Sequence, residues 1–301
     1  MNVSLRQLRV FQAVARHGNF TRAGAQVGLS QPAVSRCITE LEQQLGLKLL
    51  DRTTREVLLT DGGRSLAVRL ERALEDLDAV LQDTRGKAQQ RQGRVRVASS
   101  PTLSANLLPE CIARCRDEHP GLALLLLDRM QHDALASVRS GEVDFGVVID
   151  PGPADDLHAE AVLTEPFVLV CPPTHRLARR RGGAKWSDLA GEPLVLLDHA
   201  SGSRRLIDDA LRQHTVTASV VQEVGHVTTI FRMLDAGLGI SVVPTLALPP
   251  AGLQGLVMRP LLPRIDRDIT LVRRANRTLS PVAELAWALV RGVARERARP
   301  R

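Results

Sequence analysis

Residues 18–46, GNFTRAGAQVGLSQPAVSRCITELEQQLG, decide the fold of the first part of this 301-residue chain. Two segments of helical periodicity, 21–27 and 30–45, flank the dipeptide Gly28-Leu29, and a second glycine ends the later segment. Ser30 can cap that segment, and Pro32 falls in its first turn, where an N–H would have no helical partner. The pattern predicts two helices joined by a tight turn.

The later helix has an apolar stripe whose burial decides which side chains face outward. The stripe, with spacings of 3, 1, 3 and 4 residues, consists of Val34, Cys37, Ile38, Leu41 and Leu45. The outward set is Gln31, Ser35, Thr39 and Glu42, with Arg36 beside them. Amides, hydroxyls and a guanidinium match base edges and phosphates, so the pair of helices can be a helix-turn-helix that enters a major groove. An ordinary solvated helix face has the same composition, and this face alone leaves both interpretations open.

The segments on either side complete a small domain. Residues 4–17 have apolar positions near the helical period and end at Gly18, which predicts a first helix. Residues 47–50 and 56–60 flank a basic, threonine-rich turn and predict a two-stranded wing. Arginine forks and threonine hydroxyls in such a turn can contact DNA phosphates.

Residues 1–66 resemble the winged helix-turn-helix of the LysR-type transcriptional regulators. The motifs that carry the resemblance are LRQLRVF at 5–11, GNFTRA at 18–23, LSQPAVSR at 29–36, Leu41-Glu42, Leu45-Gly46, and DRTTR at 51–55 with Leu59-Thr60 after it. Gly24 and Leu50 stand where the family usually has Ala and Phe, and a glycine inside a helix costs up to about 1 kcal/mol. The resemblance implies DNA contacts from Thr21, Arg22, Ser30, Gln31, Pro32, Ala33, Ser35, Arg36, Arg52, Thr53 and Arg55.

Residues 61–90 form a linker and dimerisation segment in this interpretation. Its heptad seam, with spacings of 4, 3, 4 and 3, is Leu66, Leu70, Ala73, Leu77 and Val80. A narrow seam is best buried against another helix, either that of a second chain or the first helix of this chain. The resemblance implies a homodimer through this helix and a homotetramer beyond it. A polar stretch, 87–93, then forms the domain linker.

Charge is concentrated at the two ends of the chain. Residues 1–60 have eight basic and four acidic side chains, or +4; residues 61–90 have five and six, or −1; residues 91–290 have 22 of each. The last eleven residues have five and one, again +4, typical of a solvated helix end. A basic head beside a neutral body favours local contact with a polyanion. Four cysteines, no secretion signal and no membrane-length apolar run favour a cytoplasmic protein without a membrane partner.

The body, 91–301, alternates strands and helices twice. The first expected set is strand 94–98, helix 104–118, strand 122–127, helix 131–140 and strand 143–148. The second is strand 167–170, strand 194–197, helix 203–213, strand 219–223, helix 227–236 and strand 239–243, with strand 269–273 and helix 281–297 closing the chain. This order predicts two Rossmann-like α/β lobes of the periplasmic-binding-protein type. The crossings fall near 163–164 and 267–268, so lobe I is 91–163 with 268–301, and lobe II is 164–267.

Ligands of open α/β sheets bind beyond the carboxyl ends of the strands, near helix N-termini. That rule selects Ser99, Ser100, Thr102, Asp128, Arg129, His199, Ser201, Ser203, His226 and Thr228. Their hydroxyl and N–H groups suit a small anion or polar metabolite, although each Ser or Thr can equally be a helix cap or turn residue. The body also resembles the family's effector-binding domain through PFVLV at 166–170 and GLGISVVP at 237–244, which implies an inducer between the lobes.

Other chemistry finds little support. Cys111, Cys115 and His119 are spaced four residues apart, but the two thiols continue an apolar helix face, so no metal or other cofactor is expected. Nucleophile-elbow, phosphate-loop and zinc-protease motifs are not found. The sequence therefore predicts a non-enzymatic regulator of double-stranded promoter DNA, with RNA polymerase as a further partner. The alternative is a solute-binding or enzymatic α/β protein with an incidental helical head.

Overall fold

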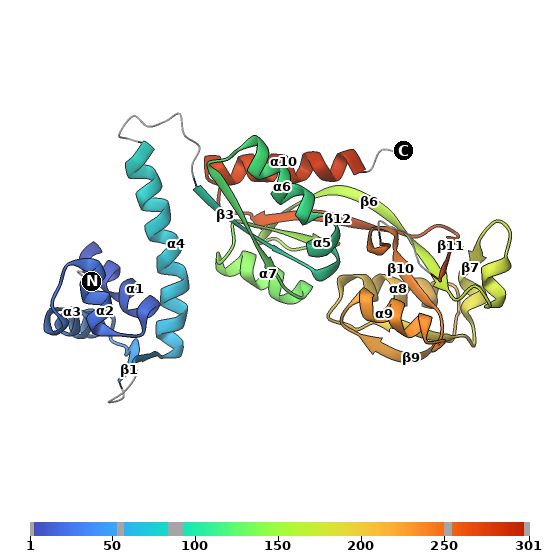
Figure 1. Cartoon of the computed structure of the whole chain (residues 1–301), viewed down its shortest axis with the longest axis horizontal. Coiled ribbons are helices and arrows are strands. Elements are labelled where there is room, and N and C mark those ends of the chain that lie inside the picture. The colour runs from blue at the N-terminus through green and yellow to red at the C-terminus, as the bar shows by residue number, and fades with distance from the viewer. Residues whose placement is uncertain (1–2, 53–56, 84–92, 250–254, 298–301) are drawn as a thin grey trace. The chain divides into compact units, whose positions relative to one another are not determined.

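The computed structural model of the chain describes residues 3–52, 57–83, 93–249 and 255–297. Contacts within the chain divide it into two compact units, Met1–Gln90 and Arg91–Arg301 (Figure 1). No helix among the described residues is both long and apolar enough to cross a membrane.

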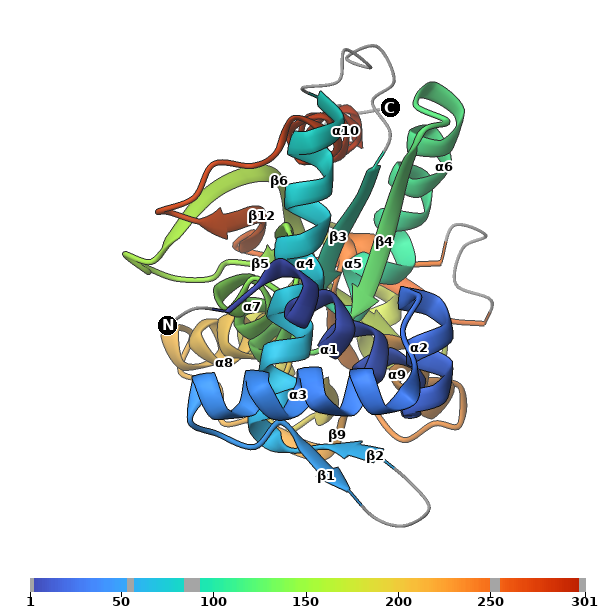
Figure 2. The same ribbon diagram turned by 90° about the vertical axis from the view of Figure 1, so that its left-hand side faces the viewer.

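The N-terminal unit has three short helices, a hairpin and one long helix. They are α1 (Leu5–His17), α2 (Phe20–Val27), α3 (Gln31–Leu45), β1 (Leu50–Arg52), β2 (Val57–Leu59) and α4 (Asp61–Asp83). Figure 2 shows α3 running across the unit above the hairpin, whose strands are antiparallel. The expected first helix, helix-turn-helix and two paired strands are present, although β1 covers Leu50–Arg52 where the expected strand was 47–50.

Local capping explains where these helices begin and end. Ser4 and Gln7 form a capping box at the start of α1, in which each side chain accepts from the other residue's backbone N–H. The side chain of Asn19 caps α2: it accepts hydrogen bonds from the backbone N–H groups of Thr21, at 2.8 Å, and Arg22, at 3.0 Å. Gly28 ends α2 with a φ of 68°, a left-handed conformation that favours glycine. The tight turn before α3 therefore has a local cause.

The core of this unit joins α4 to the helix-turn-helix. Phe11, Ile38 and Leu41 are fully buried in it, and Leu70 and Leu74 of α4 belong to the same cluster. The expected seam of α4 is thus partly used within the chain, against α1. Of its other members, Leu66 packs on the cluster, Ala73 is exposed, Leu77 is half-buried, and the side chain of Val80 lies outside the described part.

The C-terminal unit begins with a three-layer lobe, here named lobe I. Its elements are β3 (Gly93–Ser99), α5 (Pro101–Asn106), α6 (Leu108–Glu118), β4 (Leu122–Asp128), α7 (Gln131–Ser140) and β5 (Phe145–Ile149), with α10 (Pro281–Arg297) from the end of the chain. β3 pairs in parallel with both β4 and β5, as the alternating pattern predicts. Helices α5, α6 and α10 cover one face of the sheet and α7 covers the other (Figure 1).

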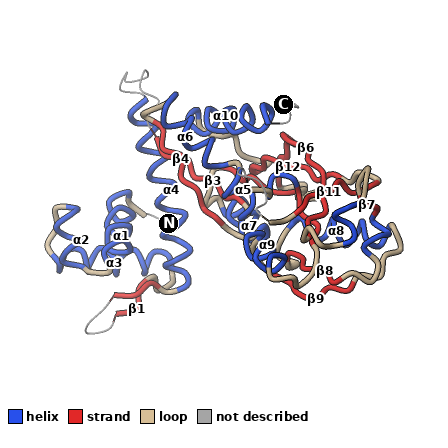
Figure 3. The backbone as a smooth tube through the Cα atoms, turned by 45° about the vertical axis from the view of Figure 1, so that its right-hand side comes forward, coloured by secondary structure: helices blue, strands red, loops and turns tan. Residues whose placement is uncertain are grey.

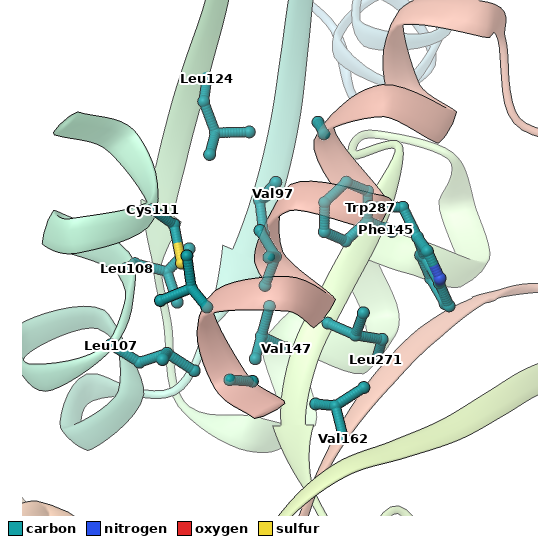
Figure 4. Packing of buried hydrophobic residues seen from close by; sticks show 14 of the residues in the cluster. Val97, Leu107, Leu108, Cys111, Leu124, Phe145, Val147, Val162, Leu271 and Trp287 are labelled. Atoms are coloured by element: carbon teal, nitrogen blue, oxygen red, sulfur yellow. The ribbon is translucent and has the colours of Figure 1, made fainter. Parts of the chain in front are cut away.

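The larger core of lobe I lies under α6 and α10. Leu108 and Cys111 of α6 point toward Val147 and Phe145 of the sheet (Figure 4). Trp287 of α10 packs edge-on against Phe145, with ring centroids 5.4 Å apart. The end of the chain is therefore part of the first lobe's core.

The remaining elements form lobe II. They are the 3₁₀ turns η1 (Arg176–Arg179), η2 (Trp186–Leu189) and η3 (Thr245–Ala247), the strands β7 (Ala184–Lys185), β8 (Pro193–Leu197), β9 (Ser219–Val224), β10 (Ser241–Pro244) and β11 (Val257–Leu262), and helices α8 (Gly202–Gln213) and α9 (Val227–Asp235). β8 and β9 lie side by side and parallel (Figure 3). β10 and β11 pair antiparallel with β6 (Leu157–Cys171).

Two strands connect the lobes. β6 (Leu157–Cys171) pairs along its first part with β12 (Asp266–Arg274) and along its last part with the lobe II strands. Thr164 is the cross-strand partner of Asp268 and donates to its carboxylate at 2.6 Å. The expectation of a strand over 167–170 alone was wrong in extent, since β6 begins ten residues earlier. The expected lobe boundaries fall on directly paired residues of β6 and β12 and stay predictions.

Candidate nucleic-acid interface and ligand site

The orientation of α3 is the first requirement of a DNA-reading helix. Val34, Ile38 and Leu41 are fully buried, which confirms the inward stripe. Gln31 and Arg36 are exposed: Arg36 lies on the opposite side of the helix, and Gln31 is the first residue of α3. Pro32 is exposed as well, and Ala33 and Ser35 are half-buried. The start of α3 therefore displays an amide and a guanidinium to solvent, on a rigidly packed helix.

Two further residues lie at the N-terminus of α2. Thr21 and Arg22 are exposed, and their backbone N–H groups are already satisfied by Asn19. Ser30 is the N-cap of α3, but its exposed side chain makes no capping hydrogen bond. Its hydroxyl is thus available to an external group, whereas a capping role was predicted for it.

The outward face of α3 is shorter than expected. Glu42 does not face solvent with Gln31: its Oε1 accepts from the N–H groups of Leu49 and Leu50, at 2.8 and 3.1 Å. The prediction for Glu42 was wrong because the chain turns back here and the carboxylate satisfies the backbone donors that lead into β1. Helical periodicity places a residue on a face but does not show which segment later covers that face.

The wing is described only in part. The antiparallel register pairs Arg52 with Val57. Thr53 and Arg55 lie outside the described residues, as does the side chain of Arg52. Their phosphate contacts stay predictions.

In lobe I, the expected ligand residues follow neighbouring strands. Ser99 ends β3 directly beside Asp128, the last residue of β4. The hydroxyls of Ser99 and Ser100 are buried and have no hydrogen-bond partner among the residues that the structure describes. Unsatisfied buried hydroxyls are costly and uncommon, so these two are suited to a group that is not part of the chain. Thr102, the second residue of α5, is half-buried.

In lobe II, Ser201 and Ser203 have internal partners. Ser201 caps α8 by accepting from the Ser203 N–H at 3.3 Å, which is the cap role weighed as its alternative. The buried Ser203 hydroxyl accepts from Arg267 at 2.6 Å. His226 and Thr228 are exposed at the start of α9, and His226, its N-cap, makes no side-chain capping bond. The His226 side chain therefore does not cap α9, whereas the Thr229 N–H donates to the His226 carbonyl at 3.1 Å.

Loops of the two lobes touch at this junction. Gly202 lies against the side-chain amide of Gln131, which is held in place by both backbone groups of Ile149. An ion pair of 3.1 Å joins Arg205 of α8 to Asp150, just past β5. The structure thus brings residues near Ser201 and Ser203 together with the start of α7.

Two expected ligand residues are engaged elsewhere. Arg129 forms a two-pronged pair with Glu142, both bonds at 2.6 Å, and also donates to Ser137. Although burial acts to raise it, the hydrogen bond from Arg129 holds the pKa of Glu142 below its usual value. An effector contact by Arg129 requires this pair to break. His199 is exposed and lies 3.7 Å from a carboxylate oxygen of Asp208, where an anion is disfavoured.

A buried charge pair between the lobes was not predicted from the sequence. Arg267 of β12 and Glu165 of β6 are both buried, and their side chains are hydrogen-bonded. Burial lowers the pKa of Arg267, because desolvation penalises the charged form. The sequence offers no clear signal for this pair, because β6 and β12 each contain other charged residues.

The cysteines of α6 serve the core. Cys111 is fully buried, and burial raises its pKa to about 12. Cys115 is buried beside it and donates weakly to the Leu122 carbonyl. In the described ranges, no group of three or more His, Cys, Asp or Glu side chains is placed to hold a metal ion.

Two family models match the chain, one for each unit. Residues 5–64 match the bacterial regulatory helix-turn-helix protein of the lysR family, and residues 88–295 match the LysR substrate binding domain. Curated relatives align along most of the chain. The HTH-type transcriptional regulator YfeR of Shigella flexneri is 51% identical over 291 residues, which cover 97% of this chain and 94% of that one. The RuBisCO operon transcriptional regulator of Allochromatium vinosum is 32% identical over 246 residues, 81% of this chain and 80% of its own.

Solved structures share the fold. Full-length OxyR from Pseudomonas aeruginosa, in a variant form, matches with a TM-score of 0.73 at 23% identity and covers 98% of each chain. Full-length CbnR, solved with its target DNA, has a TM-score of 0.68 at 21% identity, over 97% of this chain and 100% of that one. The alternative of an enzyme or solute-binding protein with an incidental head gives way to the family evidence. The chain belongs to the LysR family of transcriptional regulators, with a helix-turn-helix domain that binds promoter DNA and an effector-binding C-terminal domain.

Proposed function

We propose that this regulator reads promoter bases with the first turns of α3. The observation that carries the proposal is the exposure of Gln31 and Arg36 near the start of a helix that is anchored by fully buried apolar residues. Glutamine pairs well with adenine and arginine with guanine in the major groove. Ser30, Pro32, Ala33 and Ser35 complete the reading surface. Thr21 and Arg22 contact phosphates, together with Arg52, Thr53 and Arg55 of the wing.

The test compares the effect on DNA binding of replacing an exposed glutamine or arginine in the proposed reading surface with that of replacing the same residue type elsewhere in the unit. Gln31→Ala and Arg36→Ala should each weaken binding by about 1–3 kcal/mol and relax the preference at one base pair. Gln44→Ala, at the far end of α3, and Arg6→Ala, on α1, should leave sequence preference unchanged; both residues are exposed. The readout is affinity selection from a randomised duplex library. Equal loss on every sequence would assign Gln31 or Arg36 to the DNA backbone instead.

The effector is a small anion or polar metabolite bound at the junction of the lobes. Support comes from the buried, unsatisfied hydroxyls of Ser99 and Ser100 and from the N-terminus of α9, which the His226 side chain does not cap. A ligand there contacts both lobes and favours one arrangement of the lobes over another. The shift in this equilibrium is limited by the difference between the ligand's affinities for the two arrangements. This change is passed to the DNA-binding domains.

The effector proposal is tested by thermal shift of the full chain against small carboxylates and inorganic phosphate. A true effector at a hundredfold its Kd stabilises by about 2.7 kcal/mol. Ser100→Ala, which removes a hydroxyl with no partner in the described chain, should abolish that shift and leave the unliganded protein folded. Thr217→Ala, an exposed residue before β9, is the control. A shift that survives in Ser100→Ala places the ligand elsewhere.

Paired α4 helices join two chains into a dimer, and dimers associate into a tetramer. Ala73 of the heptad seam is exposed on α4, although Leu66 and Leu70 of that seam pack within the chain. Ala73→Glu should shift sedimentation toward monomer. Val68→Glu, an equally exposed apolar residue away from the seam, should not. An unchanged mass for Ala73→Glu removes α4 as the interface.

A further inference from the structure

One end of lobe II carries a concentration of positive charge that the functions above do not use. Residues 176–185, RLARRRGGAK, include five basic side chains, and residues 166–187 contain no Asp or Glu. We call 176–185 the arginine turn. Across 91–290 as a whole, 22 basic side chains balance 22 acidic ones, so this local excess is a departure from the rest of the unit. The turn contains η1 and β7 and lies at the end of lobe II farthest from lobe I (Figure 1).

Only part of this charge is neutralised by neighbours. Arg176 pairs with Glu192, and Arg180 pairs with Asp188. The other three cations, Arg179, Arg181 and Lys185, are exposed and form no ion pair within the described ranges of the chain. Three uncompensated charges within seven residues produce a strong local positive potential.

The arginine turn is held firmly in place. Ala184 pairs with Leu261 of β11, and the indole N–H of Trp186 donates to the Pro263 carbonyl at 3.0 Å. From β11, Arg259 donates to the Ala178 carbonyl. The three free cations therefore project from a fixed backbone, and little backbone entropy is lost when a partner binds.

The chemistry of the exposed side chains selects the partner. The apolar residues of the arginine turn are at most 4% exposed; they are Leu177, Ala178 and Ala184. The adjacent Trp186 is fully buried. Specific protein interfaces need an apolar or aromatic centre, and the arginine turn offers none. Arginine forks and a lysine ammonium without apolar neighbours match phosphate oxygens, which attract such groups independently of base sequence.

We propose that Arg179, Arg181 and Lys185 bind the phosphate backbone of promoter DNA, outside the base pairs read by α3. The inference rests on the proposed DNA-reading function and adds a second DNA contact, made by the effector-binding unit. It predicts that affinity depends on the length of the duplex as well as on its sequence. It also gives lobe II a direct role in holding DNA.

The experiment uses the full chain and two double variants that remove equal charge. Arg179→Ala/Arg181→Ala changes the arginine turn. Arg94→Ala/Arg232→Ala removes two exposed arginines elsewhere in the unit, of which Arg232 has only a 3.9 Å contact to Asp235. Binding is measured at several salt concentrations on two duplexes. The short duplex contains only the sequence selected from a randomised library. The extended duplex adds about three helical turns of DNA on each side, and each turn is about 10 base pairs.

On the extended duplex, loss of two phosphate contacts should reduce the slope of log K against log salt by about 2. On the short duplex, Arg179→Ala/Arg181→Ala should keep the wild-type slope. Arg94→Ala/Arg232→Ala should keep the wild-type slope on both duplexes. Arg179→Lys/Arg181→Lys should restore most of the slope, since it keeps the charge. The inference is overturned if Arg179→Ala/Arg181→Ala binds the extended duplex like wild type, or if the Arg94/Arg232 variant loses as much. Wild type failing on the short duplex overturns the DNA-reading function itself, which is a separate result.

Discussion

Arg267 donates from Nε and Nη2 to a single oxygen of Glu165, at 2.9 and 2.7 Å, and both side chains are buried. The other Glu165 oxygen accepts from the Thr245 hydroxyl at 2.8 Å and from the Leu246 N–H. The third arginine nitrogen donates to Ser203. One pair thus ties both crossing strands to α8 and η3.

Breaking this pair should be costly. Glu165→Gln leaves Arg267 buried without a counter-charge, and loss of one partner from such a pair costs about 3–5 kcal/mol. The double variant Glu165→Gln/Arg267→Met should be more stable than Glu165→Gln alone, because the isolated charge is gone. Both tryptophans of the chain, Trp186 and Trp287, lie in this unit, so their fluorescence during urea unfolding reports its stability. A double variant as unstable as the single one would contradict the assignment.

Gly24→Ala should destabilise the helix-turn-helix, although alanine is the better helix former. A Cβ at Gly24 would overlap the carbonyl of Leu29, whose N–H closes the turn onto the Gly24 carbonyl at 2.9 Å. We expect a loss of about 1–3 kcal/mol from overpacking. Gly292→Ala in α10 is the matched control, because nothing lies near its Cβ, and it should gain up to about 1 kcal/mol. Circular dichroism during thermal unfolding compares the two, and a more stable Gly24→Ala would show that the turn adapts.

Native thiol reactivity should separate Cys37 from the other cysteines. Cys37 is half-buried, whereas Cys111, Cys115 and Cys171 are at most 1% exposed, and burial raises the pKa of each of these thiols. At pH 8, a disulfide reagent should react first with one thiol, and Cys37→Ser should remove that phase. All four should react in denaturant. Early reaction of a second thiol in the native chain would contradict the packing of α6.

Gly202→Ala should disturb the contact between the lobes. Its Cβ would overlap the amide of Gln131, which the backbone of Ile149 holds in place. We expect a cost of about 1–3 kcal/mol and a weakened effector response. Gln131→Ala/Gly202→Ala makes room for the added methyl and should recover part of the response, measured by thermal shift. A normal response in Gly202→Ala would show that this contact does not limit the effector site.

Periodicity and caps predicted most helices well, because their causes are local. The sequence gives the bounds of α10, 281–297, and the structure has the same ones. Strand β6 was largely missed: residues 157–161 alternate apolar and polar as a strand does, but 162–165 do not, and this half is held by pairing with a segment over a hundred residues later. Long-range pairing of this kind leaves little trace within a short window.

The same distinction applies to the sites. Val34 and Ile38 could be placed inward, and Arg36 outward, from spacing alone. Gln31 has the spacing of the buried stripe but is exposed as the first residue of α3. The partners of Glu42 and Arg129 could not be foreseen, because each is bound by a backbone or carboxylate that folding brings back from another element. Nor does any short-range pattern show that the Ser99 hydroxyl lacks a partner while that of Ser203 has Arg267.

The fifteen residues of β6 lie in one sheet that runs through both lobes, pairing with β12 along the first part and with β10 and β11 along the last. Neither half can therefore be excised, expressed alone or exchanged for that of another regulator by a single cut in the gene. A chimera has to keep β6 and β12 from one parent, or replace both together so that their register survives. Recombination within this region should be tolerated only at points where β6 and β12 still come from the same parent.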